Sequence, residues 1–575
     1  MISNGRILGM LAEMARLITI DEGSSQAFKV RAYENAIHGI EGYTGDVADL
    51  DQKAMAGIKG VGASIAARIV EFVDTGSVGK LDELRGKYPV QFVELLKIPG
   101  LGPKTLKMLR SELGIENLDD LKAALEREAI RSLPGMGKTS EEKIGRSIER
   151  LGLGGKDRRT PIAEAWPVAI GLATELGSLP GVTAAVPAGS LRRLAETIGD
   201  IDIVVAADNP QPVMGAVASH PLAQSVVGTG EKKTSIITRS GIQIDVRVVA
   251  PSQLGAALVY FTGSKAHNIS LRQRAINRGW LLNEYGLFEG ERMVASETEE
   301  SIYRSLDLPL LPPPTRENSG EIEAAAKGTL PDLVTLGEIK GDLHFHSDRS
   351  GDGRSTLEEM VAAAAARGYN YLAITEHGED LAINGSSREQ MLAHRDRIRA
   401  LNESYPDMTL LYGCELNIDP NGDLDYDLEF RLLFDWCVAS VHSSFDLPAE
   451  KQTTRLLRAM SDPAVNVIGH LTGRYIGRRP GIELNLDAVL EGLAISGVAL
   501  EVNGALDRLD ASAETIRRAV ETKVKLVIST DSHHTSDLRR MEFGVANAQR
   551  GWAATTDVAN TLDPPAFLDF ARSRR

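Results

Sequence analysis

Apolar residues recur with different spacings along the chain, and each spacing predicts a different kind of element. Over residues 1–150 they recur every three or four positions, which is typical of amphipathic helices. Residues 160–250 alternate strand-like and helical runs, and residues 251–310 are mostly helical. After residue 339, short β-rich runs separated by helical stretches predict parallel βα units. Glycines 152, 154 and 155 and a proline-rich segment from Pro312 punctuate these regions. The pattern therefore predicts a multidomain protein.

The composition is that of a globular protein. Its 575 residues predict about three to five domains. A hydrophobic share of 43% and a charged share of 25% exclude a largely disordered, collagen-like or coiled-coil chain. No run of about 18 apolar residues predicts a membrane span, and charges at Arg6, Glu13 and Arg16 distinguish the first helix from a secretory signal. The two cysteines, Cys414 and Cys437, exclude a disulfide scaffold and predict a cytoplasmic protein.

The net charge of −15 is unevenly distributed. Residues 1–160 are nearly neutral, whereas the acidic excess lies in the rest of the chain, where metal ligands could be. The overall charge argues against a general nucleic-acid binder, but the N-terminal region remains able to contact phosphates.

A short motif occurs three times in the N-terminal region, as IKGVG, IPGLG and LPGMG ahead of helical patterns. Two glycines around one apolar residue form a tight turn whose N–H groups lie beside a helix N-terminus, an arrangement that favours a phosphate oxygen. Such contacts read the nucleic-acid backbone and not the bases. A single copy could be a simple helix–helix turn, the third copy above all. The set predicts backbone contacts at Gly60, Gly62, Gly100, Gly102, Gly135 and Gly137.

These repeated motifs resemble the N-terminal half of family X DNA polymerases, the family of DNA polymerase beta. There, two helical domains with helix-hairpin-helix motifs grip DNA on either side of a gap. The resemblance implies a 5′-phosphate-binding domain at residues 1–80, with Lys29 and Tyr33 in its phosphate pocket, and a second DNA-binding subdomain at residues 81–155. It places Arg68 where DNA polymerase beta has a Schiff-base lysine, so little or no deoxyribose-phosphate lyase activity is expected.

Three aspartates form a candidate metal site in the next region. Asp200 and Asp202 are two residues apart in a strand-like run, so they share a face, and Asp245 lies in the strand-like run IQIDVRVV. Converging carboxylates repel one another unless cations join them, and oxygen ligands suit Mg²⁺ or Mn²⁺. Asp-x-Asp alone would more often be a solvated strand end. Upstream, however, the sequence GSLRR at residues 189–193 can cradle a triphosphate.

Together, GSLRR and ETIGDIDIVV resemble the nucleotidyltransferase signature of family X polymerases. The resemblance implies that Asp200 and Asp202 bind both catalytic metals, and that Asp245 serves the catalytic metal and acts as the general base. It also implies that Ser190 and Arg193, in the loop that Gly189 begins, contact the triphosphate of a deoxynucleotide. A palm at residues 156–250 follows from the same match.

The motif YFTGS at residues 260–264 resembles the nucleotide-sugar motif of the family, and the series continues as His267-Asn268, Leu271-Arg272 and Asn283-Glu284-Tyr285. Taken alone, an aromatic pair at a turn could be core. The series implies that the Tyr-Phe backbone favours deoxyribose, that Asn268 contacts the base and that Arg272 monitors the template. It defines a nucleotide-selection subdomain at residues 251–311 and a linker at 312–338. The implied nucleotide-binding residues are Gly189, Ser190, Arg193, Tyr260, Phe261, Gly263, Asn268 and Arg272.

Polar residues end nearly all of the seven β-rich runs after residue 339, which are IKGDLHFH, YLAITEH, LLYGCEL, WCVASVH, VNVIGH, VALEVN and VKLVISTDSH. Six of the eleven histidines lie there, and carboxylates join them. Ligand-type residues at several strand ends predict a barrel-like site. A His/Asp/Glu set without thiolates favours Mn²⁺, Fe²⁺ or Zn²⁺ in a hydrolytic cluster. One such histidine would more often be a satisfied core residue, but six in register are not explained in that way.

Residues 339–575 resemble the PHP (polymerase and histidinol phosphatase) domain, a distorted (β/α)7 barrel that binds three metals through nine ligands. Where the family has Ser/Thr-x-x-Ser-Asp-Gly, this chain has SDRSGDG, which is one residue longer; Asp352 is the better match and Asp348 the alternative. Cys414 is expected to pack in the core. The implied metal ligands are His344, His346, Asp352, His377, Glu415, His442, His470, Asp531 and His533.

The chain is thus identified as a bacterial family X DNA polymerase fused to a PHP nuclease domain. Expected activities are filling of short gaps in base excision repair and Mn²⁺-dependent 3′→5′ exonuclease, with abasic-site cleavage or 3′-end processing as options. Expected partners are gapped or nicked DNA with a 5′-phosphate and deoxynucleoside triphosphates, with no membrane, and we expect a monomer. The alternatives are a PHP nuclease or phosphoesterase with an inactive polymerase half, and a DNA scaffold without enzymatic activity.

Overall fold

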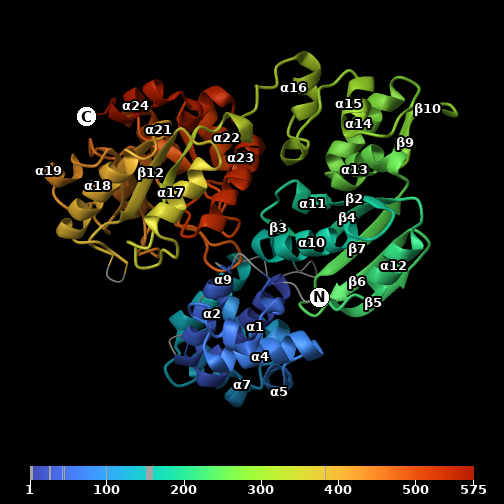
Figure 1. Ribbon diagram of the computed structural model, residues 1–575, viewed down its shortest axis with the longest axis horizontal. Coiled ribbons are helices and arrows are strands. Elements are labelled where there is room, and N and C mark those ends of the chain that lie inside the picture. Colours follow the sequence, from blue (N-terminus) through green and yellow to red (C-terminus); the bar gives the residue numbers. More distant parts are fainter. Residues whose placement is uncertain are drawn as a thin grey trace. The chain divides into compact units, whose positions relative to one another are not determined.

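The computed structural model describes residues 4–24, 28–41, 43, 46–98, 100–150, 159–381 and 384–574 (Figure 1). The chain forms two compact units: Met1–Arg158 with Gly477–Arg479, and Arg159–Ile476 with Pro480–Arg575. The predicted glycine break at residues 152, 154 and 155 and the proline of the second hairpin lie outside the described residues. Within the described residues, no helix is both long and apolar enough to cross a membrane.

The first unit is helical, as the apolar spacing predicts. One apolar cluster runs from Ile7 to Ile148, so the two predicted helical domains share a core. Arg85 ties this core's first helix to the fifth through a paired contact with Glu13 (2.7 Å). The helices are α1 Asn4–Glu22, α2 Phe28–Glu41, α3 Gln52–Met55, α4 Ala63–Thr75, α5 Gly79–Lys87, α6 Val90–Glu94, α7 Pro103–Leu113, α8 Leu118–Glu126 and α9 Lys138–Arg150.

The second unit begins with a five-stranded mixed sheet in the order β2-β4-β7-β6-β5. Its strands are β2 Val182–Pro187, β4 Asp200–Ala207, β5 Ala223–Thr229, β6 Lys233–Thr238 and β7 Gln243–Val249. Helices α10 (Ile162–Gly177) and α12 (Gln211–Ala218) bury their apolar residues against it. The central strands β4 and β7 are parallel and place Asp202 opposite Asp245. The sheet therefore brings together carboxylates that are 43 residues apart in sequence.

A helical subdomain with a small antiparallel sheet follows. It contains α13 Leu254–Thr262, α14 Lys265–Ile276, β8 Leu281–Asn283, β9 Gly286–Glu289, β10 Arg292–Ala295 and α15 Glu299–Ser305. The segment predicted as a linker also carries structure: η5 Pro313–Thr315, α16 Glu321–Lys327 and η6 Leu336–Glu338. Its polar residues are paired inside the fold. Glu321 is fully buried and lies 2.6 Å from Nδ1 of His267, whose Nε2 lies 2.8 Å from the Tyr303 hydroxyl.

The C-terminal part confirms the predicted (β/α)7 barrel. Seven parallel strands pair in chain order: β11 Gly341–Phe345, β12 Tyr371–His377, β13 Thr409–Asn417, β14 Trp436–Ser440, β15 Val467–Ile468, β16 Ala499–Asn503 and β17 Leu526–Ser529. A bridge between Phe345 and Ser532 nearly closes the ring. The helices are α17 Leu357–Ala365, α18 Arg388–Asn402, α19 Leu428–Arg431, α20 Ala449–Met460, α21 Leu486–Ser496, α22 Ala513–Glu521, α23 Arg540–Arg550 and α24 Pro564–Arg572. Cys414 and Cys437 are free, buried and part of the apolar core.

The sheet domain and the barrel pack against each other within the second unit. Leu194 of the sheet domain and Leu509 of the barrel are buried in one apolar cluster. The Trp166 ring meets the Phe543 ring edge to face at 4.9 Å. Arg474 extends the contact, because its guanidinium lies 2.8 Å from the Glu196 carboxylate and also donates to barrel carbonyls. The two domains thus share a continuous apolar contact.

Candidate active sites

The three predicted aspartates converge at one end of β4 and β7. Oxygen atoms of Asp200, Asp202 and Asp245 all lie within 4.8 Å of one another. Helix α11 (Gly189–Arg192) begins directly beside them, because a Cβ on Gly189 would be 2.5 Å from Oδ2 of Asp202. Gly189 also has a φ of +62°, which favours glycine. The first residue of this helix therefore packs against Asp202, and Ser190 is the next residue of the same helical turn.

Electrostatics distinguishes the three carboxylates. Burial, together with the charges of Asp200 and Asp245, raises the pKa of Asp202 to about 7. Burial also acts to raise the pKa of Asp245, but hydrogen bonds, first that from Lys233, lower it overall. The Lys233 ammonium lies 2.5 Å from Oδ2 of Asp245. Crowded carboxylates with only oxygen donors fit Mg²⁺ or Mn²⁺.

The two arginines of the GSLRR loop contact the neighbouring helical subdomain. Arg192 binds Glu299 with both terminal nitrogens, at 2.9 and 2.7 Å. Arg193 donates to the backbone carbonyl of Thr262, and its Nε lies 3.1 Å from Glu317. A Cβ on Gly263 would be 3.3 Å from Nη1 of Arg193. The predicted triphosphate residue thus lies beside the predicted sugar motif.

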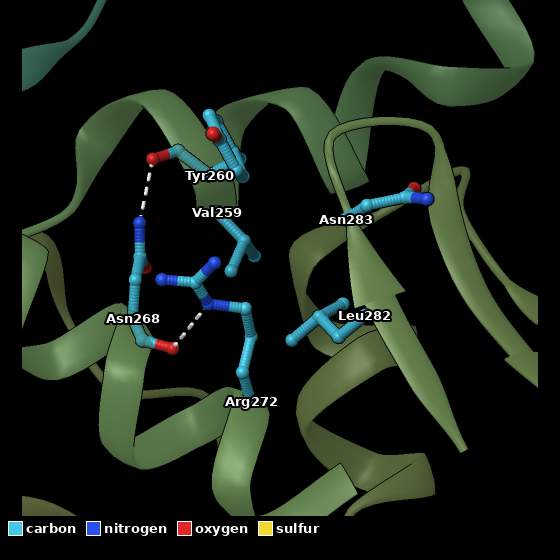
Figure 2. Close-up of a pocket in the computed structure, with 6 residues that line it drawn as sticks. All are labelled: Val259, Tyr260, Asn268, Arg272, Leu282 and Asn283. Atoms are coloured by element: carbon cyan, nitrogen blue, oxygen red, sulfur yellow. Dashed lines mark hydrogen bonds between the residues drawn. The ribbon is translucent and has the colours of Figure 1, made fainter. Parts of the chain in front are cut away.

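A small pocket contains three of the predicted nucleotide-binding residues (Figure 2). Asn268 donates to the carbonyl oxygen of Tyr260 at 2.7 Å, and Arg272 donates to the carbonyl oxygen of Asn268 at 3.2 Å. Phe261 instead stacks beneath the Arg247 guanidinium, 4.5 Å from its ring centroid. The lining residues are Val259, Tyr260, Asn268, Arg272, Leu282 and Asn283. Val259 and Leu282 were not predicted, since apolar lining residues have no sequence signal that separates them from core.

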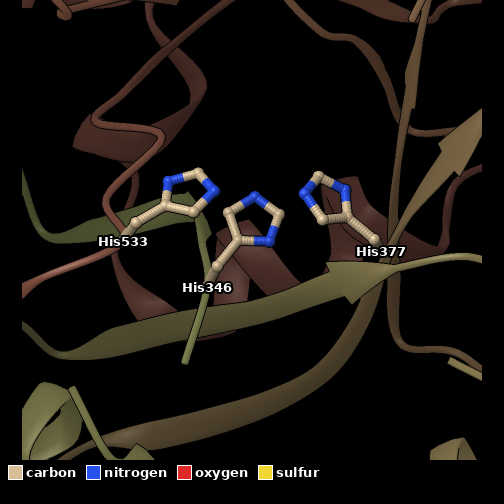
Figure 3. Close-up of side chains that lie close together, drawn as sticks. All are labelled: His346, His377 and His533. Atoms are coloured by element: carbon tan, nitrogen blue, oxygen red, sulfur yellow. The ribbon is translucent and has the colours of Figure 1, made fainter. Parts of the chain in front are cut away.

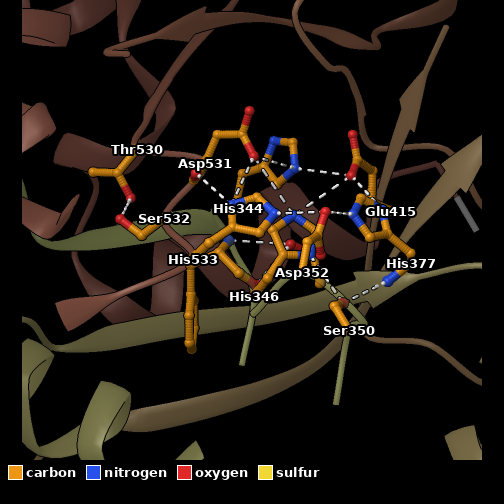
Figure 4. Close-up of polar contacts among 12 residues, drawn as sticks. His344, His346, Ser350, Asp352, His377, Glu415, Thr530, Asp531, Ser532 and His533 are labelled. Carbon is orange, nitrogen blue, oxygen red and sulfur yellow. Dashed lines mark hydrogen bonds and ion pairs between the residues drawn. The ribbon is translucent and has the colours of Figure 1, made fainter. Parts of the chain in front are cut away.

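The nine predicted PHP residues lie at or after the carboxyl ends of the barrel strands. Figures 3 and 4 label all of them except His442 and His470. The His346 ring lies between those of His377 and His533, with centroids 4.3 Å from each. Three groups have ligand atoms within 4.8 Å of one another: His346, His377 and His533; His344, His346 and Asp531; and His377, Glu415 and His442. His470 joins through Nε2, 2.9 Å from Oε1 of Glu415.

The two candidates for the third ligand, Asp352 and Asp348, have different contacts. Oδ2 of Asp352 lies 3.4 Å from Nε2 of both His377 and His533. Both aspartates are exposed, and the backbone N–H of Asp348 donates to the Ser355 carbonyl, on the loop and not toward the histidines. Figure 4 draws Asp352 among the clustered side chains. The geometry therefore favours Asp352, the better match to the family pattern.

The donor atoms of this cluster fit metal ions. The buried Nε2 atoms of His344 and His346 have no hydrogen-bond partner within the described protein, although buried polar atoms normally have one, and Nδ1 of His377 lies 2.9 Å from Oε2 of Glu415. Burial and the neighbouring His377 and His533 hold the pKa of His346 well below its usual value, so it is the neutral, metal-binding form. Burial opposes ionisation of Glu415, but the surrounding histidines, first His442, hold its pKa well below normal. The neutral imidazole of His346 and the ionised carboxylate of Glu415 are the protonation states that metals require. Burial acts to lower the pKa of His344 and His377, but the neighbouring carboxylates, first Glu501 and Glu415 respectively, raise it, for His377 to about 10, so metal binding there would release protons.

Two buried glutamates that were not among the predicted ligands support the cluster. Glu501 accepts from Nδ1 of His344 at 2.6 Å, which leaves Nε2 of that ring directed at the cluster. Glu376 accepts hydrogen bonds from Ser347 and Ser350, both in the loop that carries Asp352. An acidic residue inside an otherwise apolar strand, as in ALEVN, was the available sequence signal.

The three glycine motifs form the same turn. Gly60, Gly100 and Gly135 all have positive φ, at +89°, +97° and +77°. In each turn the residue after this glycine donates to the carbonyl three positions earlier, at 2.9–3.0 Å. A Cβ on Gly62, Gly102 or Gly137 would meet nothing within 4 Å, so these second glycines, each directly before a helix, face open space. The turns therefore leave room for a backbone ligand.

The predicted 5′-phosphate residues lie on α2. Lys29 is exposed and pairs with Glu22 at 2.6 Å. Tyr33 is buried, and the Arg68 guanidinium lies 5.8 Å from its ring centroid. The structure thus brings Arg68 to Tyr33, while Lys29 contacts the end of α1.

Comparison with protein families identifies the parts of this architecture. Residues 2–78 match a helix-hairpin-helix domain and residues 92–149 a SAM-like helix-hairpin-helix tandem. Residues 257–317 match the DNA polymerase beta thumb, and residues 342–532 match the PHP domain. Fold and sites therefore define a polymerase-beta-type protein with a C-terminal PHP barrel.

Individual relatives extend this assignment to nearly the whole chain. It is 37% identical over 550 residues to the DNA polymerase/3′-5′ exonuclease PolX of Bacillus subtilis (strain 168), covering 94% of this chain and 95% of that protein. The chain therefore belongs to the PolX family, the family X DNA polymerases that carry a C-terminal PHP domain, as the sequence motifs predicted.

Part of the chain is also similar to smaller proteins. A probable phosphatase of Clostridium acetobutylicum is 30% identical over 201 residues, covering 33% of this chain and 78% of that protein. A probable phosphatase of Vibrio vulnificus (strain YJ016) is 25% identical over 247 residues, covering 41% and 94%.

Proposed function

We propose that this chain is a DNA polymerase that fills short gaps with a 5′-phosphate in base excision repair, and that its barrel is a metal-dependent 3′→5′ exonuclease. One observation carries the proposal: the chain brings together two complete sets of metal-type ligands, the aspartate triad and the nine-residue cluster. The name of the Bacillus subtilis relative combines the same two activities. We therefore assign synthesis to the triad and degradation to the barrel.

In synthesis, Asp200, Asp202 and Asp245 would hold two Mg²⁺ or Mn²⁺ ions. When bound, these ions lower the pKa of the primer 3′-hydroxyl and neutralise charge on the leaving pyrophosphate. Asp245 would accept the proton of the 3′-hydroxyl, a role that requires Lys233 to release the carboxylate it pairs with. Ser190 and Arg193 would bind the triphosphate, while Tyr260 and Asn268 position the sugar and base.

In degradation, the nine clustered residues would hold three divalent ions, with Mn²⁺ favoured by the mixture of imidazoles and carboxylates. When bound, these ions supply an activated water and polarise the terminal phosphodiester. Glu501 would fix the orientation of His344, and Glu376 the position of the loop bearing Asp352.

The similarity of part of this chain to probable phosphatases supports a second candidate, removal of a 3′-terminal phosphate by the barrel. An oligonucleotide ending in a 3′-phosphate tests this candidate beside one ending in a 3′-hydroxyl. Release of inorganic phosphate without release of mononucleotides would assign the barrel to 3′-end processing.

The central experiment uses a duplex with a one-nucleotide gap, with either a 5′-phosphate or a 5′-hydroxyl downstream. We expect extension by one nucleotide with Mg²⁺ or Mn²⁺, faster with the 5′-phosphate, and 3′ degradation with Mn²⁺ when nucleotides are omitted. Degradation without extension would support a nuclease with an inactive polymerase half. Hydrolysis of histidinol phosphate with no action on DNA would support a small-molecule phosphoesterase.

A further inference from the structure

A chain of three charged residues connects the proposed nucleotide site to the barrel. Arg193 directly follows helix α11, Glu317 lies in the segment after η5, and Arg550 ends α23. Oε1 of Glu317 lies 3.1 Å from Nε of Arg193 and 3.0 Å from Nη1 of Arg550. Arg550 also donates to the backbone carbonyl of Arg193 at 2.5 Å. One carboxylate oxygen is therefore shared by an arginine from each domain.

This pairing engages the side chain that would bind the triphosphate. The Arg193 side chain is 13% exposed, with Nε at Glu317 and Nη1 at the Thr262 carbonyl. A carboxylate and a triphosphate are both anions that bind a guanidinium through charge-assisted hydrogen bonds. Because both would use the same side chain, Glu317 and an incoming triphosphate compete for Arg193.

The neighbouring residue Arg192 forms a stronger ion pair, with which the Arg193–Glu317 pair can be compared. Arg192 binds Glu299 through two nitrogens, and Arg316 binds the same carboxylate at 2.6 Å. Glu299 is 11% exposed, whereas Glu317 is 32% exposed and meets Arg193 through a single oxygen. A single, partly exposed ion pair is weak enough to exchange with a ligand.

We propose that Glu317 sets the affinity of the polymerase site for the nucleotide triphosphate by competing for Arg193, and that Arg550 weakens this competition by sharing the Glu317 carboxylate. Glu317 and Arg550 are positioning residues that act through Arg193. This inference rests on the proposed function, in which Arg193 contacts the triphosphate. It gives the barrel a direct effect on nucleotide binding in the polymerase half.

The test measures KM for the nucleotide and kcat in one-nucleotide gap filling by the full chain. Glu317→Gln removes the competing charge, so KM should fall about two- to fivefold. Arg550→Ala leaves Glu317 to Arg193 alone, so KM should rise by a similar factor. The double variant should follow Glu317→Gln, and kcat should stay within about twofold in all three, since neither residue contacts the reacting atoms.

The opposite directions separate competition from a structural role. If the network merely holds the domains together, both single variants should raise KM and lower the unfolding temperature, and that result overturns the inference. Unchanged KM in both variants overturns it as well. Glu323→Gln is the matched control, because Glu323 is an exposed glutamate on neighbouring α16 and its loss of charge should leave KM unchanged.

Arg193→Ala distinguishes failure of this inference from failure of the proposed function. It should raise KM strongly, whatever Glu317 does. If wild-type enzyme extends the primer but Arg193→Ala leaves KM unchanged, the proposed triphosphate contact is wrong. If Arg193→Ala raises KM while Glu317→Gln has no effect, only the competition is wrong.

Discussion

The two candidate metal sites differ in how their charged side chains are balanced. In the triad, three carboxylates meet and only Asp245 is paired, with Lys233; Asp200 is exposed, and burial together with repulsion raises the pKa of Asp202 to about 7. In the barrel, carboxylates lie among imidazoles in a largely buried cluster, and the histidines around Glu415 keep it ionised. The first arrangement suits ions that arrive with a substrate, whereas the second suits ions that are part of the fold.

The largest expected effect comes from disabling each site in turn. Asp200→Ala with Asp202→Ala should reduce gap filling by about 1,000-fold or more while degradation persists, because the metals carry the chemistry. His344→Ala with His346→Ala should abolish degradation and leave synthesis. Both are measured on one gapped duplex, with and without nucleotides. A folded double variant that loses both activities would refute the assignment of separate sites.

The second effect tests whether the barrel cluster depends on its buried supports. Glu501→Ala should lower metal affinity or nuclease activity by roughly 10- to 100-fold, because His344 loses the acceptor that fixes its ring. Metal content after dialysis, measured by elemental analysis, provides a readout independent of activity. Gap filling is the internal control and should be unchanged. Full metal retention with full degradation would show that His344 is oriented by packing alone.

The third effect concerns DNA binding by the glycine turns, on which both proposed activities depend. If the glycine turns hold the DNA backbone, binding of gapped DNA should weaken by about an order of magnitude or more for each few-fold rise in salt. Measured by anisotropy with the wild-type chain and both double variants, the salt dependence should be the same in all three. A flat salt response would contradict backbone contact by the hairpins.

The smallest expected effect concerns deoxyribose-phosphate lyase activity, which we expect to be low or absent. Arg68, whose guanidinium lies over Tyr33, supplies charge but no amine for an imine, so borohydride should trap little or no adduct on an incised abasic site. Arg68→Lys restores the amine and should increase trapping above the wild-type background. A strong wild-type adduct mapped to the first 80 residues would contradict the prediction, and Lys29 or Lys59 would be the first alternatives to check.

The sequence was sufficient to predict the strands and the ligands at their ends, but not the buried glutamates that pair with residues far away in sequence. All seven β-rich runs after residue 339 form barrel strands, because each combines apolar residues with a polar end. The nine cluster residues follow from the same strand ends. Glu317, Glu376 and Glu501 could not be assigned, since their partners lie in distant segments that only the folded chain brings together.

The segment at 312–338 also shows that composition does not predict which charged residues find buried partners. Its prolines and charges predicted a linker, yet Arg316 and Glu321 are fully buried. Composition describes a residue's average environment, whereas burial of a charge depends on a specific partner, here Glu299 for Arg316 and His267 for Glu321. The predicted domain boundaries stay predictions. The residues between the two boundaries at 312 and 338 are folded.

The apolar contact between the sheet domain and the barrel limits how freely these two modules can be recombined. A gene truncated before the barrel would encode a polymerase half whose Leu194 and Trp166 lose the cover of Leu509 and Phe543. Newly exposed apolar surface of this kind promotes self-association. Fragments used to study either half alone would therefore need polar substitutions at these positions, and shuffling of barrels between relatives would succeed only where both faces of the contact are exchanged together.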